Sequence, residues 1–322
     1  MSSWKKILLT NFTDVRKLAD FLELDISSLW LHPRFILNVP RRLAEKMEKK
    51  RLDDPLLRQF IPLAQEKNSS EGFQNDPLED ISFKKEKKLL QKYEGRALVI
   101  STSACAMHCR YCFRQNFPYE TAQKDFQAEI DFLKNNPTLT EVILSGGDPL
   151  SLTDETLGEL LQALDAIPHL KRIRFHSRFL IGIPERADAS FLRLLSQVQK
   201  QIWFVVHTNH PLELDADVLS SLKSIQKLGI PTLNQSVLLK GVNDDPTTLK
   251  HLSETLVDNG IVPYYLHQLD RVTGTAHFEV PLEQGRSLVQ TLAHTLSGYA
   301  VPRYVKEEPG QPCKTTLSTS AL

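Results

Sequence analysis

The chain has 322 residues, and its 39 basic and 39 acidic side chains leave no formal net charge at neutral pH. This length predicts one large α/β domain with an accessory segment, and the balanced charge gives no basis for bulk attraction to nucleic acid or a membrane surface. No apolar run approaches the ~20 residues that span a bilayer. The run 7–9 is too short for the apolar core of a secretion signal, so we expect a cytoplasmic protein with reduced thiols.

Residues 1–92 differ from the rest of the chain and predict a helical N-terminal cap. Apolar residues recur at helical spacing in stretches such as 14–22, and prolines such as Pro33 and Pro55 divide the region into short pieces. The basic run 84–88 is interpreted as a solvated helix face.

Apolar runs and helical patterns alternate after Arg96. The predicted strands are 97–102, 141–144, 172–175, 203–206, 231–237, 262–266 and 300–305. The predicted helices are 122–134, 153–166, 189–199, 217–228, 247–259 and 282–296. This alternation predicts right-handed βαβ units and a parallel sheet, either open and doubly wound or curled into a partial barrel. We expect the barrel domain to span 93–305 and a C-terminal segment to span 306–322.

Polar residues gather just after the ends of the predicted strands, where sites lie in parallel α/β folds. They are Cys105, Gly146, Asp148, Ser177, Arg178, His207, Asn209, Asn234, Gln235 and Asp270.

Three cysteines, Cys105, Cys109 and Cys112, follow the first predicted strand with the spacing C-x3-C-x2-C. Four cysteines close the coordination of a [4Fe–4S] cluster, whereas three leave one iron open to a substrate or cofactor. A structural zinc site is an alternative, but its fourth ligand is then His108, which lies awkwardly between two other ligands. A disulfide with a spare thiol needs an oxidising compartment. The fourth cysteine, Cys313, lies far away in sequence.

The cysteine motif resembles the signature of the radical S-adenosylmethionine (SAM) enzymes, in which the open iron binds SAM and a 5′-deoxyadenosyl radical is formed. The resemblance favours a partial (β/α)6 barrel over an open sheet. It implies that Tyr111 flanks the SAM adenine and that Gly146, Gly147 and Asp148 meet the SAM amino group. His207 and Gln235 are expected as SAM or cofactor contacts.

Longer motifs resemble the lysine 2,3-aminomutases, which combine radical SAM chemistry with pyridoxal 5′-phosphate (PLP). They are the runs 145–150, 207–211, 234–244, 297–302 and 307–317. The resemblance implies that Lys314 forms the aldimine with PLP, and that Arg96 and Asn234 contact the PLP phosphate or ring. Cys313 is then a passive neighbour of the lysine.

The same resemblance assigns the substrate contacts. Arg114 matches an arginine that binds the substrate carboxylate, and Asp270 matches an aspartate that pairs with the distal ammonium. The second acid of the family is an aspartate seven residues before the PLP lysine, whereas this chain has Glu307 there, one methylene longer. Two carboxylates facing one ammonium select a basic amino acid.

We therefore expect an isomerase that converts free (S)-α-lysine to (R)-β-lysine, reduced by a flavodoxin- or ferredoxin-type protein. Only eight residues follow Lys314. This resembles the short bacterial form that supplies β-lysine for modification of elongation factor P by a separate ligase, and predicts a monomer or weak homodimer. The alternatives are a 2,3-aminomutase for another amino acid such as glutamate, a modifier of a protein-bound lysine, and an iron–sulfur electron carrier or redox sensor.

Overall fold

The computed structural model describes residues 3–120 and 125–317. Within them, one ten-stranded sheet contains all the strands in chain order. The strands are β1 (Lys84–Glu86), β2 (Leu89–Tyr93), β3 (Arg96–Thr102), β4 (Glu141–Gly146), β5 (Arg172–Ser177), β6 (Gln201–His207), β7 (Thr232–Val237), β8 (Val262–His267), β9 (Arg303–Lys306) and β10 (Thr315–Thr316). Strands β3 to β9 run parallel, and antiparallel pairs β1–β2, β2–β3 and β9–β10 complete the two edges.

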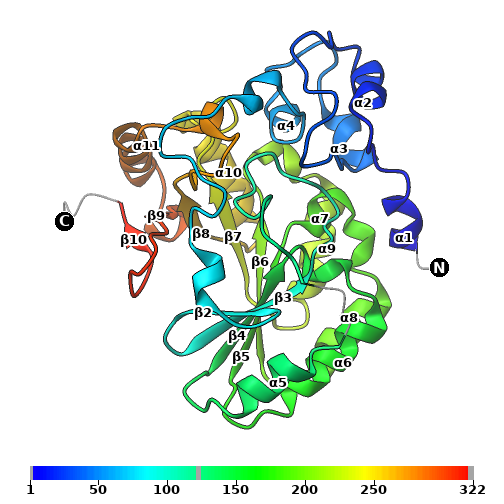
Figure 1. Cartoon of the computed structure of the whole chain (residues 1–322), viewed down its shortest axis with the longest axis vertical. Coiled ribbons are helices and arrows are strands. Elements are labelled where there is room, and N and C mark those ends of the chain that lie inside the picture. Colours follow the sequence, from blue (N-terminus) through cyan, green and yellow to red (C-terminus); the bar gives the residue numbers. More distant parts are fainter. Residues whose placement is uncertain (1–2, 121–124, 318–322) are drawn as a thin grey trace.

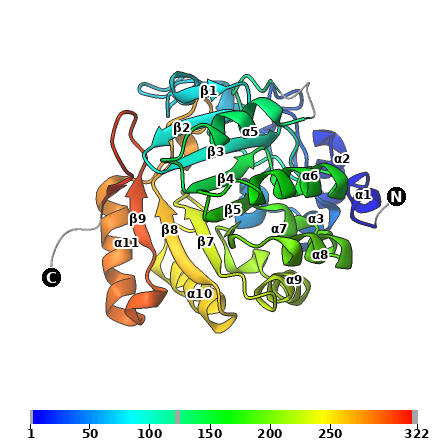
Figure 2. The ribbon, with the colours of Figure 1, turned by 90° about the horizontal axis from the view of Figure 1, so that it is seen from below.

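The sheet curls into a partial barrel with helices along its outside (Figures 1 and 2). In the part of the chain that the structure describes, β1 and β10 are the two edges and do not pair with each other, so the barrel stays open. The predicted fold class is confirmed. The α-helices are α1 (Ser3–Leu8), α2 (Val15–Leu22), α3 (Arg41–Lys46), α4 (Pro55–Arg58), α5 (Gln127–Lys134), α6 (Asp154–Asp165), α7 (Phe179–Gly182), α8 (Ala189–Gln197), α9 (Ala216–Gln226), α10 (Pro246–Asp258) and α11 (Leu282–Thr295). The 3-10 helices are η1 (Ala64–Lys67), η2 (Asp80–Phe83), η3 (Pro149–Ser151), η4 (Pro184–Arg186), η5 (Pro211–Glu213), η6 (Ala276–Phe278) and η7 (Gly298–Ala300).

Local side-chain caps fix where several barrel helices begin. The carboxylates of Asp188, Asp215 and Asp245 accept hydrogen bonds from backbone N–H groups in the first turns of α8, α9 and α10, at 2.9–3.0 Å. Such caps satisfy donors that have no partner inside the helix. They explain why the predicted starts of these helices agree with the structure to within a residue or two.

Residues 3–83 are helical and irregular, but the segment 1–92 that was predicted to be helical also contains β1 and most of β2, so the basic run is not a helix. Residues 84–88 form β1 and the turn into β2, and Lys88 is buried with its Nζ 3.9 Å from the ring centre of Phe126. The interpretation of this run as a solvated helix face is therefore wrong. The predicted helix 122–134 begins at Gln127 among the described residues, and residues 121–124 lie outside them.

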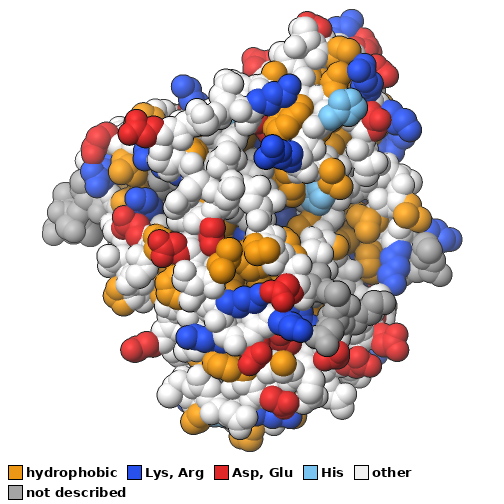
Figure 3. All heavy atoms as spheres, in the orientation of Figure 1, with side chains coloured by type: hydrophobic (Ala, Val, Ile, Leu, Met, Phe, Trp, Pro, Cys, Tyr) orange, Lys and Arg blue, Asp and Glu red, His pale blue; other side chains and the backbone are white. Residues whose placement is uncertain are grey.

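The surface is mixed in charge. The face seen in Figure 3 intersperses acidic and basic side chains with apolar ones, as expected for a chain without net charge. None of the helices within 3–120 and 125–317 is long and apolar enough to cross a bilayer.

Candidate active site

A cavity of about 600 Å³ lies inside the barrel and reaches the carboxyl ends of the parallel strands. The cysteine loop forms one part of its wall, and the C-terminal β9–β10 hairpin forms another. Most of the predicted site residues line it. They are Arg96, Cys105, Cys109, Tyr111, Cys112, Arg114, Gly146, Gly147, Asp148, His207, Gln235, Asp270, Glu307 and Lys314.

The three cysteines of the motif are free thiols that line this cavity together. Cys112 N donates to Cys109 O at 3.0 Å, which closes the turn between the last two of them. Burial raises the pKa of the Cys112 thiol to about 11, and the neighbouring Cys109 adds to the shift. An unliganded thiol here stays protonated, whereas iron bound to these sulfurs replaces the protons. Without iron, the side chains of the described residues form no ready-made metal-binding group, but three cysteines on one cavity wall supply the ligand number of a cluster that keeps one iron open.

The N-terminal segment holds the cysteine loop from outside. Arg110, between the second and third cysteines, is buried and its Nε donates to both Glu66 oxygens at 3.1 and 3.2 Å. Asn38 Nδ2 donates to Cys105 O at 3.0 Å, and His108 N donates to Asn38 O at 2.9 Å. The segment therefore fixes the backbone that carries the thiols.

Gly146 and Gly147, at the end of β4, let two backbones approach closely beside the first cysteine. Gly147 N donates to Thr102 O at 2.7 Å, and a Cβ at Gly147 would lie 2.4 Å from Ala104 O. Gly146 has φ +105°, which favours glycine. Glycine is therefore needed at both positions, because the backbone of residues 102–104, just before Cys105, packs directly against them.

Replacing Gly147 by alanine is expected to destabilise the protein by about 2–3 kcal/mol, because a backbone oxygen cannot yield to the new methyl group. Chemical denaturation of the cluster-free protein measures the change. Gly298→Ala is the matched control, since a Cβ there meets no atom within 4 Å. Equal stability of the two variants would contradict the packing argument.

Asp148 ties the end of β4 to β5. Its carboxylate accepts hydrogen bonds from Leu150 N at 3.0 Å, from Ser177 Oγ at 2.9 and 3.0 Å, and from Arg178 N at 2.8 Å. Burial raises the pKa of Asp148 to about 6, although these hydrogen bonds act to lower it. Asp148 lines the cavity, but its oxygens already have protein donors, so a contact with SAM through this carboxylate stays a prediction.

A chain of ion pairs of alternating sign runs along the cavity wall from the cysteine loop to Lys314. Arg114 Nε lies 2.7 Å from Asp80 Oδ2, and Asp80 Oδ1 lies 2.6 Å from Lys92 Nζ. Lys92 Nζ lies 3.2 Å from Glu307 Oε1, and Glu307 Oε2 pairs with Lys314. The sequence did not predict Asp80 or Lys92, because no local pattern marks a partner that is close only in the folded chain.

The β9–β10 hairpin explains the last of these pairs. Thr315 pairs with Lys306 and Thr316 with Val305, so the antiparallel register brings Lys314 opposite Glu307. Burial acts to raise the pKa of Glu307, but the charges of Lys314 and Lys92 outweigh it and lower the pKa to about 2.

Asp270 makes no such ion pair with any residue that the structure describes. Burial raises its pKa to about 7, and the negative charge of Glu307 adds to the effect. The two acids of the predicted ammonium site therefore differ, because the pKa of Glu307 is lowered by its cationic neighbours whereas the pKa of Asp270 is raised by burial.

Three histidines line the cavity, His176 and His207 from the neighbouring strands β5 and β6 and His267 from β8. His176 Nδ1 lies 3.1 Å from His207 Nε2, and the Nε2 atoms of His176 and His267 are buried without a partner among the described residues. Burial lowers the pKa of all three, to about 3 for His207. These imidazoles are neutral at physiological pH and can hydrogen-bond a ligand without adding charge.

His176 and Arg174 were missed by the sequence analysis, although a signal exists. In β5 the polar residues 172, 174 and 176 alternate with buried Ile173 and Phe175. Alternate residues of a strand point to opposite faces, so this pattern marks a polar face toward the barrel interior.

Three residues predicted to contact SAM or PLP have protein partners that the sequence did not reveal. Asn234 is buried and does not line the cavity. Its side-chain amide is bound by the protein instead: Oδ1 accepts from Thr208 N at 3.1 Å, and Nδ2 donates to Ser236 Oγ at 2.8 Å. Tyr111 lines the cavity, and its hydroxyl accepts from Asn209 Nδ2 at 2.6 Å. Arg96 lines the cavity with its guanidinium carbon 4.4 Å from the ring centre of Tyr93.

Comparison with known proteins identifies relatives both of the cysteine-containing region and of the whole chain. Residues 93–181, which contain the three cysteines, match the 4Fe-4S single cluster domain family. An L-lysine 2,3-aminomutase of Escherichia coli strain K12 is 41% identical over 322 residues, covering 98% of this chain and 94% of the relative. The chain belongs to the L-lysine 2,3-aminomutase family. The predicted resemblance is thereby confirmed, and this aminomutase is a radical SAM isomerase that uses a [4Fe–4S] cluster and SAM.

Two further proteins are similar to this chain, one over almost its whole length and one only distantly. An L-lysine 2,3-aminomutase of Haemophilus influenzae strain Rd is 39% identical to this aminomutase over 320 residues, covering 97% of this chain and 95% of the relative. A crystal structure of a radical SAM methyltransferase from Sphaerobacter thermophilus has a TM-score of 0.48 and 18% identity, covering 67% of this chain and 68% of that one. The second likeness is too distant to bear on function.

Proposed function

We propose that this protein converts free L-lysine to β-lysine by moving the α-amino group to carbon 3, with PLP as a third cofactor. The observation that carries the proposal is that one cavity is lined both by the three thiols and by Lys314. A carrier of electrons has no use for a lysine and a charged pocket beside its cluster. The names of the relatives supply the substrate.

The residues near Lys314 fit PLP. A lysine amine is needed to anchor the cofactor, and Lys314 reaches the cavity. Arg96, Arg174 and Arg303 also line it, and Arg174 Nε is buried without a hydrogen-bond partner among the described residues. Guanidinium groups suit a phosphate. When bound, PLP would supply a conjugated ring that delocalises the unpaired spin while the amino group migrates, and the cluster with SAM would supply the radical that abstracts hydrogen.

The protein's own groups then have distinct tasks. Arg114 is expected to bind the substrate carboxylate, since Asp80 engages its Nε and a planar carboxylate can use the remaining N–H groups. Glu307 and Asp270 are expected to bind the distal ammonium. In this structure the Lys314 amine pairs with Glu307 Oε2. When Lys314 holds the cofactor, this oxygen becomes free to bind the substrate ammonium. An acidic side chain would be repelled, which argues against glutamate as the substrate.

The affinity for lysine should depend on the ionisation of Asp270. With a pKa of about 7, most of its carboxyl is protonated at pH 6 and ionised at pH 8, so we expect the KM for lysine to fall about tenfold as pH rises between them. The charged groups that act on Asp270 are Glu307, Lys314, Lys92 and Asp80. Glu307, with its pKa of about 2, does not titrate in this range.

Steady-state kinetics of wild type and Asp270→Asn from pH 6 to 8 measure this effect. The variant should have a higher KM that no longer depends on pH. A constant KM in the wild type, or the same slope in the variant, would place the ammonium elsewhere.

An anaerobic assay tests the function itself. Reconstituted protein is mixed with SAM, PLP, dithionite and L-lysine, and the products are separated by chiral chromatography. β-Lysine is the expected product. SAM cleavage without β-lysine would leave the radical SAM core intact but overturn lysine as the substrate, and other amino acids or a lysine-containing protein would then be tried.

We propose (R)-β-lysine as the product and modification of elongation factor P as its use. The support is resemblance to the short bacterial aminomutases, together with the coverage of 94% and 95% of the two bacterial relatives. Chiral separation tests the configuration. Transfer of labelled product to elongation factor P by its ligase tests the use.

A further inference from the structure

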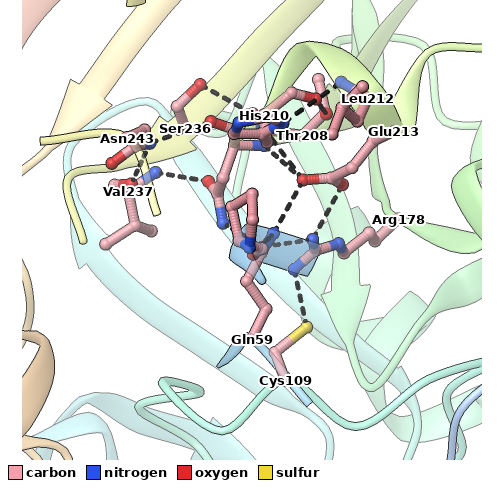
Figure 4. A network of polar contacts seen from close by, with 12 residues as sticks. Gln59, Cys109, Arg178, Thr208, His210, Leu212, Glu213, Ser236, Val237 and Asn243 are labelled. Carbon is pink, nitrogen blue, oxygen red and sulfur yellow. Dashed lines mark hydrogen bonds and ion pairs between the residues drawn. The ribbon is translucent and has the colours of Figure 1, made fainter. Parts of the chain in front are cut away.

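The guanidinium of Arg178 lies against the sulfur of the second cysteine. Arg178 directly follows β5, and its Nη1 lies 3.0 Å from Cys109 Sγ (Figure 4). Nη1 also donates to the Tyr111 hydroxyl. Arg178 is buried, so its charge acts on this sulfur through protein and not through bulk water.

A fully buried acid holds the guanidinium in place. Glu213 has no exposed surface, and its Oε2 accepts from Arg178 Nη2 at 2.8 Å. Glu213 Oε1 accepts from the backbone N–H of Asn209 at 3.0 Å and from that of His210 at 3.1 Å; Figure 4 labels Glu213 and His210. These bonds fix the carboxylate, so the arginine cannot swing away from the thiol without leaving a buried charge unpaired.

The N-terminal segment also contributes a side chain that binds both Arg178 and Glu213. Gln59, directly after α4, is buried; its Oε1 accepts from Arg178 Nη2 at 2.6 Å and its Nε2 donates to Glu213 at 3.2 Å. The backbone N–H of Arg178 also donates to Asp148 Oδ2 at 2.8 Å. Arg178 is thus oriented from three separate parts of the chain.

The guanidinium of Arg178 is oriented toward the Cys109 sulfur and does not form a two-bond ion pair with Glu213. A guanidinium can donate two parallel bonds to one carboxylate, but here only Nη2 faces Glu213. Nη1 faces Cys109 and Tyr111, and Nε is buried without a hydrogen-bond partner among the described residues. Hydrogen bonds to ligand sulfurs and nearby positive charge raise the reduction potential of iron–sulfur clusters, because they stabilise the added electron.

We propose that Arg178 sets the reduction potential of the [4Fe–4S] cluster through Cys109, and that Glu213 and Gln59 position it for this task. The step concerned is the transfer of one electron from an external reductant to the oxidised cluster. Arg178 makes this transfer more favourable and takes no part in bond making or breaking. The inference rests on the cluster and not on lysine as the substrate, so it can fail while the proposed function stands.

The test is an EPR-monitored redox titration, with dithionite as the reductant, of the reconstituted protein without SAM. Arg178→Met is expected to lower the midpoint potential, with at least a tenfold weaker reduction equilibrium, which is 59 mV for one electron. Arg178→Lys should lie between Arg178→Met and wild type, because it keeps the charge but not the fork. Iron and sulfide counts confirm that each variant holds its cluster.

Glu213→Gln gives a second measurement with the opposite sign. It keeps the shape and removes a negative charge, so the midpoint potential should rise. A merely structural role predicts lost iron, or cluster-loaded variants that keep the wild-type potential. An unchanged potential in cluster-loaded Arg178→Met overturns the proposal. If that variant does not hold iron, Arg178→Lys and Glu213→Gln decide, and wild-type potentials in both overturn it.

Discussion

Lys314→Ala is expected to reduce β-lysine formation by about a thousandfold or more and to abolish the visible absorbance of bound PLP. Without the amine, nothing anchors the cofactor covalently. Glu307 keeps its second partner, Lys92 at 3.2 Å, so the pocket should not collapse. Assays of β-lysine and absorbance spectra of the PLP-treated protein measure the two effects, and iron content should stay at the wild-type value.

Lys306→Ala is the matched control. Lys306 lies on β9, pairs with Glu308 at 3.2 Å and is absent from the residues that line the cavity. Its loss should leave both the PLP absorbance and the turnover nearly unchanged. Persistence of the PLP band in Lys314→Ala, or its loss in Lys306→Ala, would show that another amine holds the cofactor.

Cys109→Ala is expected to lose the cluster and with it all SAM cleavage and lysine turnover, because two remaining thiolates cannot hold the cluster. The barrel should stay folded, since a partly buried cysteine contributes little to its core. Iron and sulfide analysis, SAM cleavage by chromatography and circular dichroism together measure the result.

Cys313→Ser provides the comparison. Cys313 is exposed, lies beside Lys314 and is distant from the motif in sequence, although it lines the same cavity. This variant should bind iron and cleave SAM as the wild type does. If Cys109→Ala retained a cluster that cleaves SAM, or if Cys313→Ser lost it, the ligand set inferred from the motif would be wrong.

The barrel could be predicted because its signals are local. Parallel strands buried on both faces are nearly continuous apolar runs, and the run 203–206 lies within β6 (Gln201–His207). Strands β1 and β2 escaped prediction. Their conformation comes from antiparallel pairing of β1 with β2 and of β2 with β3, whereas the segment 84–93 is rich in lysine, which is uncommon in strands.

The site residues also fall into those that a local sequence pattern marks and those that only the folded chain brings together. Residues that belong to contiguous motifs, such as Cys105 and Gly147, could be located from the sequence. Asn234 and Gln235 are adjacent on β7, where burial alternates, so only one of them can face the cavity, and it is Gln235. Lys92 could not be predicted, since its partners Asp80 and Glu307 come from distant parts of the chain.

The strand that follows Lys314 has two residues, and among the strands within 3–120 and 125–317 it pairs with β9 alone. Few hydrogen bonds must break for it to detach, whereas the cysteine loop is tied down by Arg110, Asn38 and the end of β4. Local opening of so short an edge strand requires much less free energy than unfolding of the sheet. In the function proposed above, the fixed cysteine loop would hold the cluster in place while the short edge strand would open to admit and release PLP, and we expect faster amide exchange in β10 than in β3.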